Sequence, residues 1–184
     1  MKSTPWRLAL LVLASFALPA FAAPKKVLVV TVTTGFRHSS IPTAERILSQ
    51  LAAESGGKFT VDFVRQPEGE PKRPGAPKGK QADDAKAKEK FTTDMKAYEA
   101  ALPAWNAKVV EALKALAPSN LKNYDAVLFA STTGDLPLPD KQGFVDWVAA
   151  GHAFIGIHAA TDTFHQFPPR SEEHTSELQS RFGI

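Results

Sequence analysis

Three short apolar runs, each followed by small polar residues, limit the folds that this chain can adopt. The first, residues 27–32, reads VLVVTV and is rich in β-branched side chains. The other two are residues 126–130 (AVLFA) and 153–157 (AFIGI). A strand that is apolar at nearly every position suits a sheet covered on both faces, which is the usual state of a parallel sheet. The runs therefore predict an α/β protein with helices on both faces of a parallel sheet.

Helical patterns separate these strands, as parallel pairing requires. Ser39 or Ser40 is placed to cap a helix that has Pro42 in its first turn. The helix has one apolar face, which consists of Ala44, Ile47, Leu48 and Leu51. The Gly56–Gly57 pair ends it, and residues 59–64 alternate as a further strand. Such a strand–helix–strand unit is the crossover that joins parallel strands.

A second crossover follows residues 126–130. Pro139 and Asp140 open its helix, and Gly151 stands where a terminating glycine belongs. The inner face of this helix is expected to consist of Phe144, Trp147 and Val148. The strand at residues 153–157 then completes the unit.

Residues 66–118 form an insertion between the two crossovers. Residues 66–80 hold four prolines among glycine and lysine, and we expect this part to be unable to order itself because it buries little apolar surface. Residues 82–116 are helix-forming, and Pro103 is expected to begin a second helix there. An apolar stripe at helical spacing consists of Phe91, Met95, Tyr98 and Leu102. We interpret the stripe as packing against the side of the domain, with a cofactor or partner groove as the alternative.

Residues 1–22 have the pattern of a secretory signal peptide. Lys2 and Arg7 form a positive start, residues 8–17 are apolar, and residues 20–22 (AFA) form a cleavage signature. The apolar core is shorter than the roughly 20 residues that span a membrane, so cleavage is favoured over retention as an anchor. We therefore expect an exported protein, periplasmic or extracellular, without membrane contact after cleavage.

Composition excludes several classes of function. The chain has no cysteine, which removes every mechanism that needs a thiol. Its net charge is only +3, and most lysines lie among carboxylates in the insertion, so a nucleic-acid partner is rejected. The sequence contains neither a G-x-G-x-x-G pattern nor a P-loop, so nucleotide binding lacks support.

Polar residues follow three of the predicted strands at the point where each strand ends. Ligands of open α/β sheets bind beyond these carboxyl ends. The clusters are Thr34, Gly35, Arg37, His38 and Ser39 after the first run, Thr132, Thr133, Gly134 and Asp135 after the second, and His158, Thr161, Asp162 and His165 after the third. Packing does not require polar side chains at all three strand ends. We therefore expect them to converge on one site.

Within these clusters, His38 and His158 are the candidates for proton transfer, because imidazole ionises near neutral pH. Asp135 or Asp162 would orient them, and ordinary structural hydrogen bonding is the alternative for each histidine. Arg37 is a candidate to hold an anion or a sugar hydroxyl, or to pair with Asp135. The other candidate substrate-binding residues are Gly35, Thr133, Gly134 and Thr161; for the glycines a turn is the alternative role, as helix capping is for Ser39 and Ser40.

A metal site is a weaker hypothesis. His158, Asp162 and His165 are spaced i, i+4, i+7, which would place three possible zinc ligands on one face of a helix that begins directly after the last strand. Pro168 and Pro169 soon end any such helix, and metal coordination demands stricter geometry than spacing alone supplies. We predict no cofactor and keep a divalent metal as the minor alternative.

Three blocks of the sequence together resemble the ThuA-like family, which is named for trehalose utilisation. They read VLVVTVTTGFRHSSIP, YDAVLFASTTGDLP and AFIGIHAATDTFHQFP, in this order. The resemblance covers residues 26–169, apart from the insertion. It implies a flavodoxin-like sheet related to class I glutamine amidotransferases, and a small carbohydrate or an oxidised sugar derivative as the substrate.

One departure from the amidotransferases decides against their activity. Their strand–turn–helix elbow carries a nucleophilic cysteine in a G-x-C-x-G pattern, whereas residues 156–160 here read GIHAA, with His158 at the position of the cysteine. Imidazole is a poor substitute for a thiolate in acyl transfer, so we expect no glutamine hydrolysis. Two functions stay open: an enzyme acting on sugars or oxidised sugars, and a non-catalytic carbohydrate-binding or scaffold module.

Residues 170–184 resemble the translation of a sequencing adapter, through the stretch RSEEHTSELQS. The alternative is a polar surface helix, with Glu173 and Glu177 one turn apart. We expect the authentic sequence to end near Pro169, which would leave the domain truncated at its C-terminus.

Overall fold

The computed structural model describes residues 23–165. The predicted signal peptide and the predicted non-native tail lie outside the described residues. The elements, with η for a 3-10 helix, are β1 (Lys25–Val30), α1 (Ile41–Glu54), β2 (Phe59–Val64), η1 (Gly79–Gln81), α2 (Ala85–Leu113), η2 (Lys114–Leu116), α3 (Pro118–Leu121), β3 (Ala126–Ala130), α4 (Lys141–Ala149), β4 (Ala153–Ile157) and η3 (His158–Asp162). Three of the four strands have the predicted bounds, and the first begins and ends two residues earlier than predicted.

The strands form one parallel sheet with the order β2-β1-β3-β4. Val29 of β1 pairs with Phe63 of β2 on one side and with Leu128 of β3 on the other. The chain builds outward in opposite directions from β1 and β3, so these two strands flank the topological switch point at which ligands of such sheets bind. The structure confirms the predicted α/β class and its flavodoxin-like strand order.

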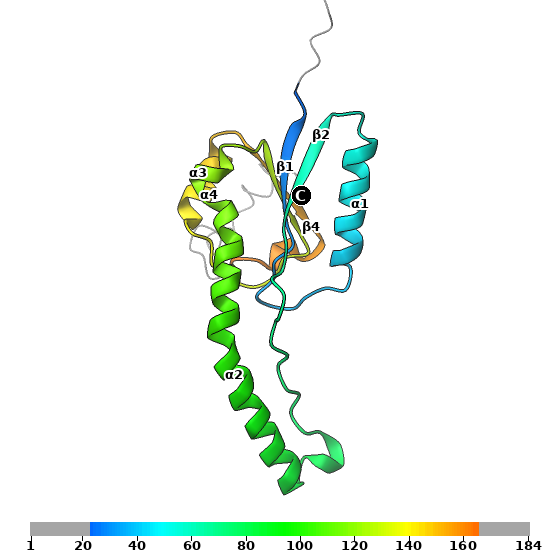
Figure 1. Cartoon of the computed structure of the whole chain (residues 1–184), viewed down its shortest axis with the longest axis vertical. Helices are drawn as coiled ribbons and strands as arrows, with labels where there is room; N and C mark the ends of the chain where they lie inside the picture. The colour runs from blue at the N-terminus through cyan, green and yellow to red at the C-terminus, as the bar shows by residue number, and fades with distance from the viewer. Residues whose placement is uncertain (1–22, 166–184) are drawn as a thin grey trace, which may run out of the picture.

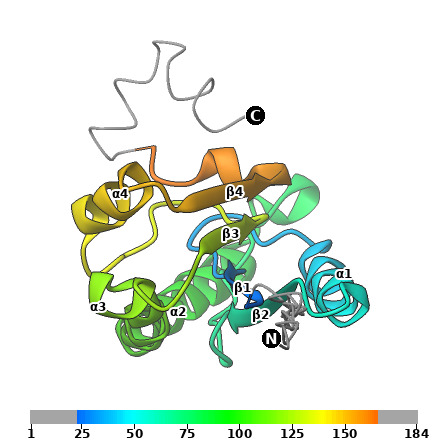
Figure 2. The same cartoon turned by 90° about the horizontal axis from the view of Figure 1, so that it is seen from above.

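Helices cover both faces of the sheet, with α1 on one face and α2, α3 and α4 on the other (Figures 1 and 2). The larger core lies on the α2–α4 side and includes Val30, Val127 and Phe129 from the sheet. The smaller core lies under α1 and consists of Val29, Leu128 and Ala130, with Val27, Ala44, Leu48, Val61 and Phe63 packed against it. The sheet thus has two cores of unequal size.

The face under α1 is only partly covered. Ile47 and Leu51, two of the four residues predicted for the apolar face of α1, are 43% and 49% exposed. Ile155 and Ile157 of β4 are also exposed, and Ile155 pairs in register with Leu128, which lies under α1. Because β4 is an edge strand of the described sheet, these two isoleucines leave an apolar surface at that edge.

The ends of the helices follow the predicted signals in one case and not in another. Asp140 caps α4 by accepting a hydrogen bond from Gly143 N at 2.8 Å, and Gly151 follows the helix with φ 103°. Ser40 occupies the N-cap position of α1, but its side chain makes no capping hydrogen bond. Its hydroxyl lies 3.5 Å from that of Ser131 instead. Ser40 therefore takes the predicted position at the start of the helix, but its side chain does not make the predicted capping hydrogen bond.

α2 is a single helix of 29 residues, so the prediction that Pro103 begins a second helix was wrong. A proline inside a helix removes the hydrogen bond to the carbonyl four residues earlier, here that of Glu99. Both residues are exposed, so water can satisfy that carbonyl group. None of the helices in residues 23–165 combines the length and the apolar character that crossing a membrane requires.

The two halves of α2 differ in their surroundings. Trp105, Val109 and Leu113 in the second half are buried in the larger core. The first half extends beyond the sheet (Figure 1) and carries the stripe that includes Met95 and Tyr98, which is only half-buried. Only the second half therefore belongs to the body of the domain.

Residues 66–78 run alongside the projecting half of α2 (Figure 1). Pro71, Pro74 and Pro77 are half-buried while the residues between them are exposed, a period of three that matches a polyproline II helix. Pro71 and Pro74 face Tyr98 of the helix across a shallow pocket. The expectation that this segment cannot order itself overlooked the helix, which supplies the apolar surface that the segment lacks.

Two adjacent valines of α2 test this division of the helix. Val109 is 1% exposed and Val110 is 42% exposed. We expect Val109→Ala to lower the free energy of unfolding by about 2–3 kcal/mol, because it removes two buried methyl groups and leaves a cavity. Val110→Ala is expected to change it by less than about 0.5 kcal/mol. Urea denaturation of the two variants measures the difference, and equal effects would contradict the burial of this face.

A second prediction concerns Asp125, which precedes β3. Its carboxylate accepts hydrogen bonds from Lys25 Nζ at 2.7 Å and from Lys26 N at 2.8 Å, and these bonds, the first above all, hold the pKa of Asp125 below its ordinary value of 3.8. A pKa lowered in the folded state stabilises the protein above the ordinary value, and this stabilisation is lost as the pH falls through the folded value. We therefore expect the stability difference between the wild type and Asp125→Asn to shrink below about pH 4. Urea unfolding across that range measures it, and a difference independent of pH would contradict the assignment.

Candidate functional site

The loops that follow β1 and β3 and the segment that follows β4 are joined by main-chain hydrogen bonds. Thr34 N and Gly35 N donate to Thr133 O at 3.0 and 3.3 Å. Gly134 N donates to Asp162 O at 3.0 Å, which ties the same loop to the segment after β4. The three polar clusters grouped from the sequence therefore meet at one edge of the sheet, at the switch point between β1 and β3.

Gly35 and Gly134 lie against each other at this junction. A Cβ atom on Gly134 would lie 2.6 Å from Gly35 N, and Gly134 has φ 79°. Neither the space nor the backbone conformation suits a larger residue. Gly35 and Gly134 were candidates to bind substrate, with a turn as their alternative role, and this close approach of the backbone fits the turn.

The imidazole rings of His38 and His158 are in contact. Their centroids are 4.6 Å apart, and the rings are nearly perpendicular, at 81°. The ring of Phe36 also contacts His38. The centroids of these two rings are 4.8 Å apart, and the rings are again nearly perpendicular, at 80°. His38 follows β1 and His158 follows β4, although β3 lies between these two strands. The structure thus brings together the two residues predicted for proton transfer.

The backbone turns sharply at the strand ends that form this site. His158 has φ 57° and Ser131, the first residue after β3, has φ 56°. In the described part of the chain only Phe164 joins them as a non-glycine residue with positive φ. Such a conformation costs about 1–2 kcal/mol per residue and concentrates at functional sites. The elbow expected at His158 is therefore present in the backbone.

The predicted carboxylate partners of the histidines are engaged elsewhere. Asp135 accepts a hydrogen bond from Lys141 Nζ at 2.7 Å. Asp162 pairs with His165 Nε2 at 2.7 Å. Throughout residues 23–165, no carboxylate lies within ion-pair distance of His38 or His158. The prediction that one of these aspartates orients a histidine was wrong, because Asp135 pairs with the first residue of α4 and Asp162 pairs with the histidine three residues further along the chain.

The geometry of the weaker metal hypothesis also differs from expectation. Residues 158–162 form η3, a 3-10 helix with three residues per turn, so His158 and Asp162 do not share the face that an α-helix would give them. Thr161, a predicted substrate-binding residue, lies in η3 and is exposed. Over the described range, no group of three His, Cys, Asp or Glu side chains is arranged to hold a metal ion.

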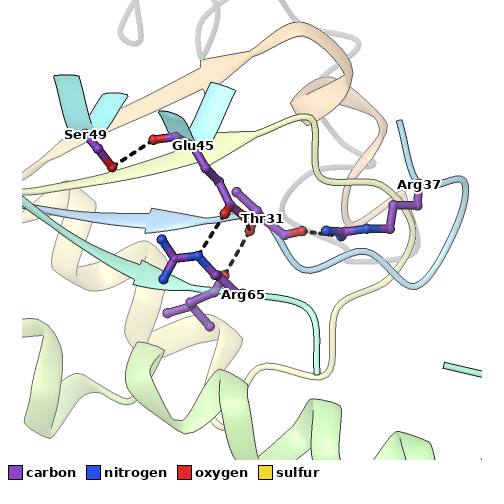
Figure 3. A network of polar contacts seen from close by, with 6 residues as sticks. Thr31, Arg37, Glu45, Ser49 and Arg65 are labelled. Carbon is purple, nitrogen blue, oxygen red and sulfur yellow. Dashed lines mark hydrogen bonds and ion pairs between the residues drawn. The ribbon is translucent and has the colours of Figure 1, made fainter. Parts of the chain in front are cut away.

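Arg37 supports the loop rather than pairing with Asp135. Its Nη1 atom donates to Thr31 O at 2.9 Å (Figure 3). Thr31 in turn donates through its hydroxyl to Glu45 Oε1 at 2.6 Å, and Arg65 Nε donates to the other oxygen of Glu45 at 2.8 Å. The network joins the end of β1, α1 and the residue after β2, and so fixes the start of the loop that carries His38.

Sequence reasoning missed Glu45 and Arg65. They lie 14 residues after Thr31 and 20 residues after Glu45 respectively, and no local pattern marks either of them. Thr133 was predicted to bind substrate, but it is buried and its hydroxyl donates to Phe36 O at 2.8 Å. That hydrogen bond makes Thr133 a support of the loop after β1.

Comparison with known proteins gives one finding. The protein-family model described as ThuA, trehalose utilisation, matches residues 26–171. The matched region contains β2, β3 and β4, all of β1 except its first residue, and every residue of the site. Neither the curated proteins nor the solved structures contain a match.

The backbone at His158 yields a prediction about stability. Because φ is 57° there, we expect His158→Gly to leave the free energy of unfolding unchanged or to raise it by up to about 1 kcal/mol. His158→Val, whose branched side chain disfavours this conformation, is expected to lower it by about 1–2 kcal/mol. Thermal and urea unfolding separate the variants, and a valine variant as stable as the glycine variant would argue against the strained turn.

Proposed function

The chain belongs to the ThuA trehalose utilisation family, and on this premise we propose that it acts on a small carbohydrate or an oxidised sugar derivative at the β1–β3 edge of the sheet. The observation that carries the proposal is the contact between His38 and His158, 4.6 Å between ring centroids. Two titratable rings from separate loops meet where ligands of this architecture bind.

Two adjacent imidazoles suit proton transfer on an oxidised sugar. Imidazole serves as acid or base near neutral pH, and such transfers accelerate reactions typically 10²–10⁴-fold. A ring carbon next to a ketone carries an acidic proton. One histidine takes that proton as the new carbon–carbon double bond forms, while the other gives a proton to the ketone oxygen. The reaction is a keto–enol conversion that needs no cofactor and no thiol.

Other features support the same assignment. The chain contains no cysteine, so it lacks the nucleophile of glutamine amidotransferases. Arg37 keeps further donor groups beyond the one that binds Thr31, and these are available for a sugar hydroxyl. The signal-like pattern of residues 1–22 supports a place of action outside the cytoplasm, in the periplasm or beyond the cell.

A non-catalytic carbohydrate-binding module is the second candidate. The observation that favours it is that neither imidazole has a carboxylate partner within residues 23–165. Catalytic histidines are commonly oriented by such a partner. In this case the pair would donate and accept hydrogen bonds to sugar hydroxyls without turnover.

Turnover of trehalose and of its 3-keto derivative separates the two candidates. We expect His38→Ala and His158→Ala each to lower the rate by roughly 10²–10⁴-fold, because each removes one partner of the proton transfer. His152→Ala is the matched control, since this histidine precedes β4 at the opposite edge of the sheet and stacks on Trp147 at 4.3 Å. Sugar binding without turnover would favour the binding module, and turnover indifferent to both site variants would end the enzymatic proposal.

A further inference from the structure

Phe36 exposes more of its surface than any other large apolar side chain in the described chain. Phe36 is 71% exposed, whereas the next residue in order, Leu51, is 49% exposed. An aromatic ring loses favourable burial when it is left in water, so an exposed ring beside a polar cluster is a common mark of a ligand-binding surface. The position of Phe36 in the loop after β1 places it in the site described above.

The backbone of the loop that carries Phe36 is held in place by hydrogen bonds. The Phe36 carbonyl accepts a hydrogen bond from Thr133 Oγ1 at 2.8 Å. The preceding residue, Gly35, donates to Thr133 O, and the following residue, Arg37, donates to Thr31 O at 2.9 Å. The backbone is therefore held on both sides of Phe36 while its side chain stays in water.

The ring also stands next to the histidine pair. Phe36, His38 and His158 form a row in which each ring meets the next at nearly a right angle, with centroids 4.8 and 4.6 Å apart. Edge-to-face contacts of this kind fix the relative orientation of aromatic rings. A ligand that contacts Phe36 is therefore separated from His158 only by the imidazole ring of His38.

Phe164, the other aromatic residue near the site, differs from Phe36 because its ring contacts other side chains. Its ring centroid lies 6.0 Å from that of Phe129 in the core and 5.4 Å from Lys141 Nζ. Both neighbours give it a structural role at the end of η3. Phe36 has no comparable cover, since most of its surface is open to water.

We propose that Phe36 is the stacking platform of the site, on which the apolar C–H face of a pyranose ring lies while its hydroxyl or ketone oxygens reach His38 and His158. The inference rests on the proposed function and adds the ligand class that the platform selects: rigid sugar rings with one face of C–H groups. The electron-rich face of an aromatic ring attracts such C–H groups, and burial of the two apolar surfaces adds to the affinity.

Binding measurements on variants of Phe36 test the platform. The full 184-residue chain is titrated with trehalose and with its 3-keto derivative, and with sorbitol as a polyol that has no ring. We expect Phe36→Ala to weaken sugar binding roughly ten- to hundred-fold. Phe36→Trp should retain binding to within about threefold, whereas Phe36→Leu should lose it by about tenfold, because leucine has no flat face. Val110→Ala, a change at an exposed apolar residue of α2, should have no effect.

Proton NMR of the ligand supplies a direct readout of stacking. Protons of one sugar face should shift upfield on binding to the wild type, as expected above an aromatic ring, and this shift should vanish with Phe36→Ala. Because Phe36 is exposed, its variants should melt at the wild-type temperature. Wild-type binding that depends on His158 but is unchanged by Phe36→Ala, or that Phe36→Leu retains as well as Phe36→Trp does, would overturn the platform alone. A wild type that binds neither sugar would overturn the proposed function together with it.

Discussion

Parallel hydrogen bonding between β1 and β3 is the constraint on which the site depends. It aligns the ends of two strands that are far apart in the chain, so that the hydroxyl of Thr133 reaches the carbonyl of Phe36, 97 residues away. The long insertion between these strands does not oppose the pairing strongly, since the entropy cost of closing a loop grows only slowly with its length. Because all paired strands are parallel, the loops after β1, β3 and β4 leave the sheet at the same edge.

That edge combines a rigid backbone with exposed side chains. The main-chain hydrogen bonds among the three loops and the Thr31–Glu45–Arg65 network hold the backbone in place, and the positive φ angles at Ser131 and His158 are kept by their surroundings. The rings of Phe36 and His158 meanwhile face water. A folded chain holds such a combination against the hydrophobic effect and against backbone strain, which is the pattern expected of a binding surface.

The projecting half of α2 packs against the proline segment rather than against the sheet. Neither the helix stripe nor the proline segment has enough apolar surface for a core of its own, but Pro71 and Pro74 of the segment lie opposite Tyr98 of the stripe across a shared pocket. From the sequence alone, residues 66–80 were predicted to be unable to order, and the helical segment was predicted to be divided at Pro103. The helix continues through Pro103 because that residue lies on the exposed side, where water can satisfy the carbonyl that the proline leaves without a donor.

Local patterns determined the elements of this protein, because apolar runs, helical periodicity and the glycines after α1 and α4 depend only on neighbouring residues. Strand bounds, the cap at Asp140 and the family resemblance were all accessible at that level, and strand-end polar clusters already indicated where the site would lie. Only the tertiary structure decided which side chains meet: Asp135 with Lys141, Asp162 with His165, Arg37 with Thr31, and His38 with His158. Side-chain partners depend on distances of a few ångströms between separate elements, and those distances exist only once the strands have paired and the backbone has turned at each strand end.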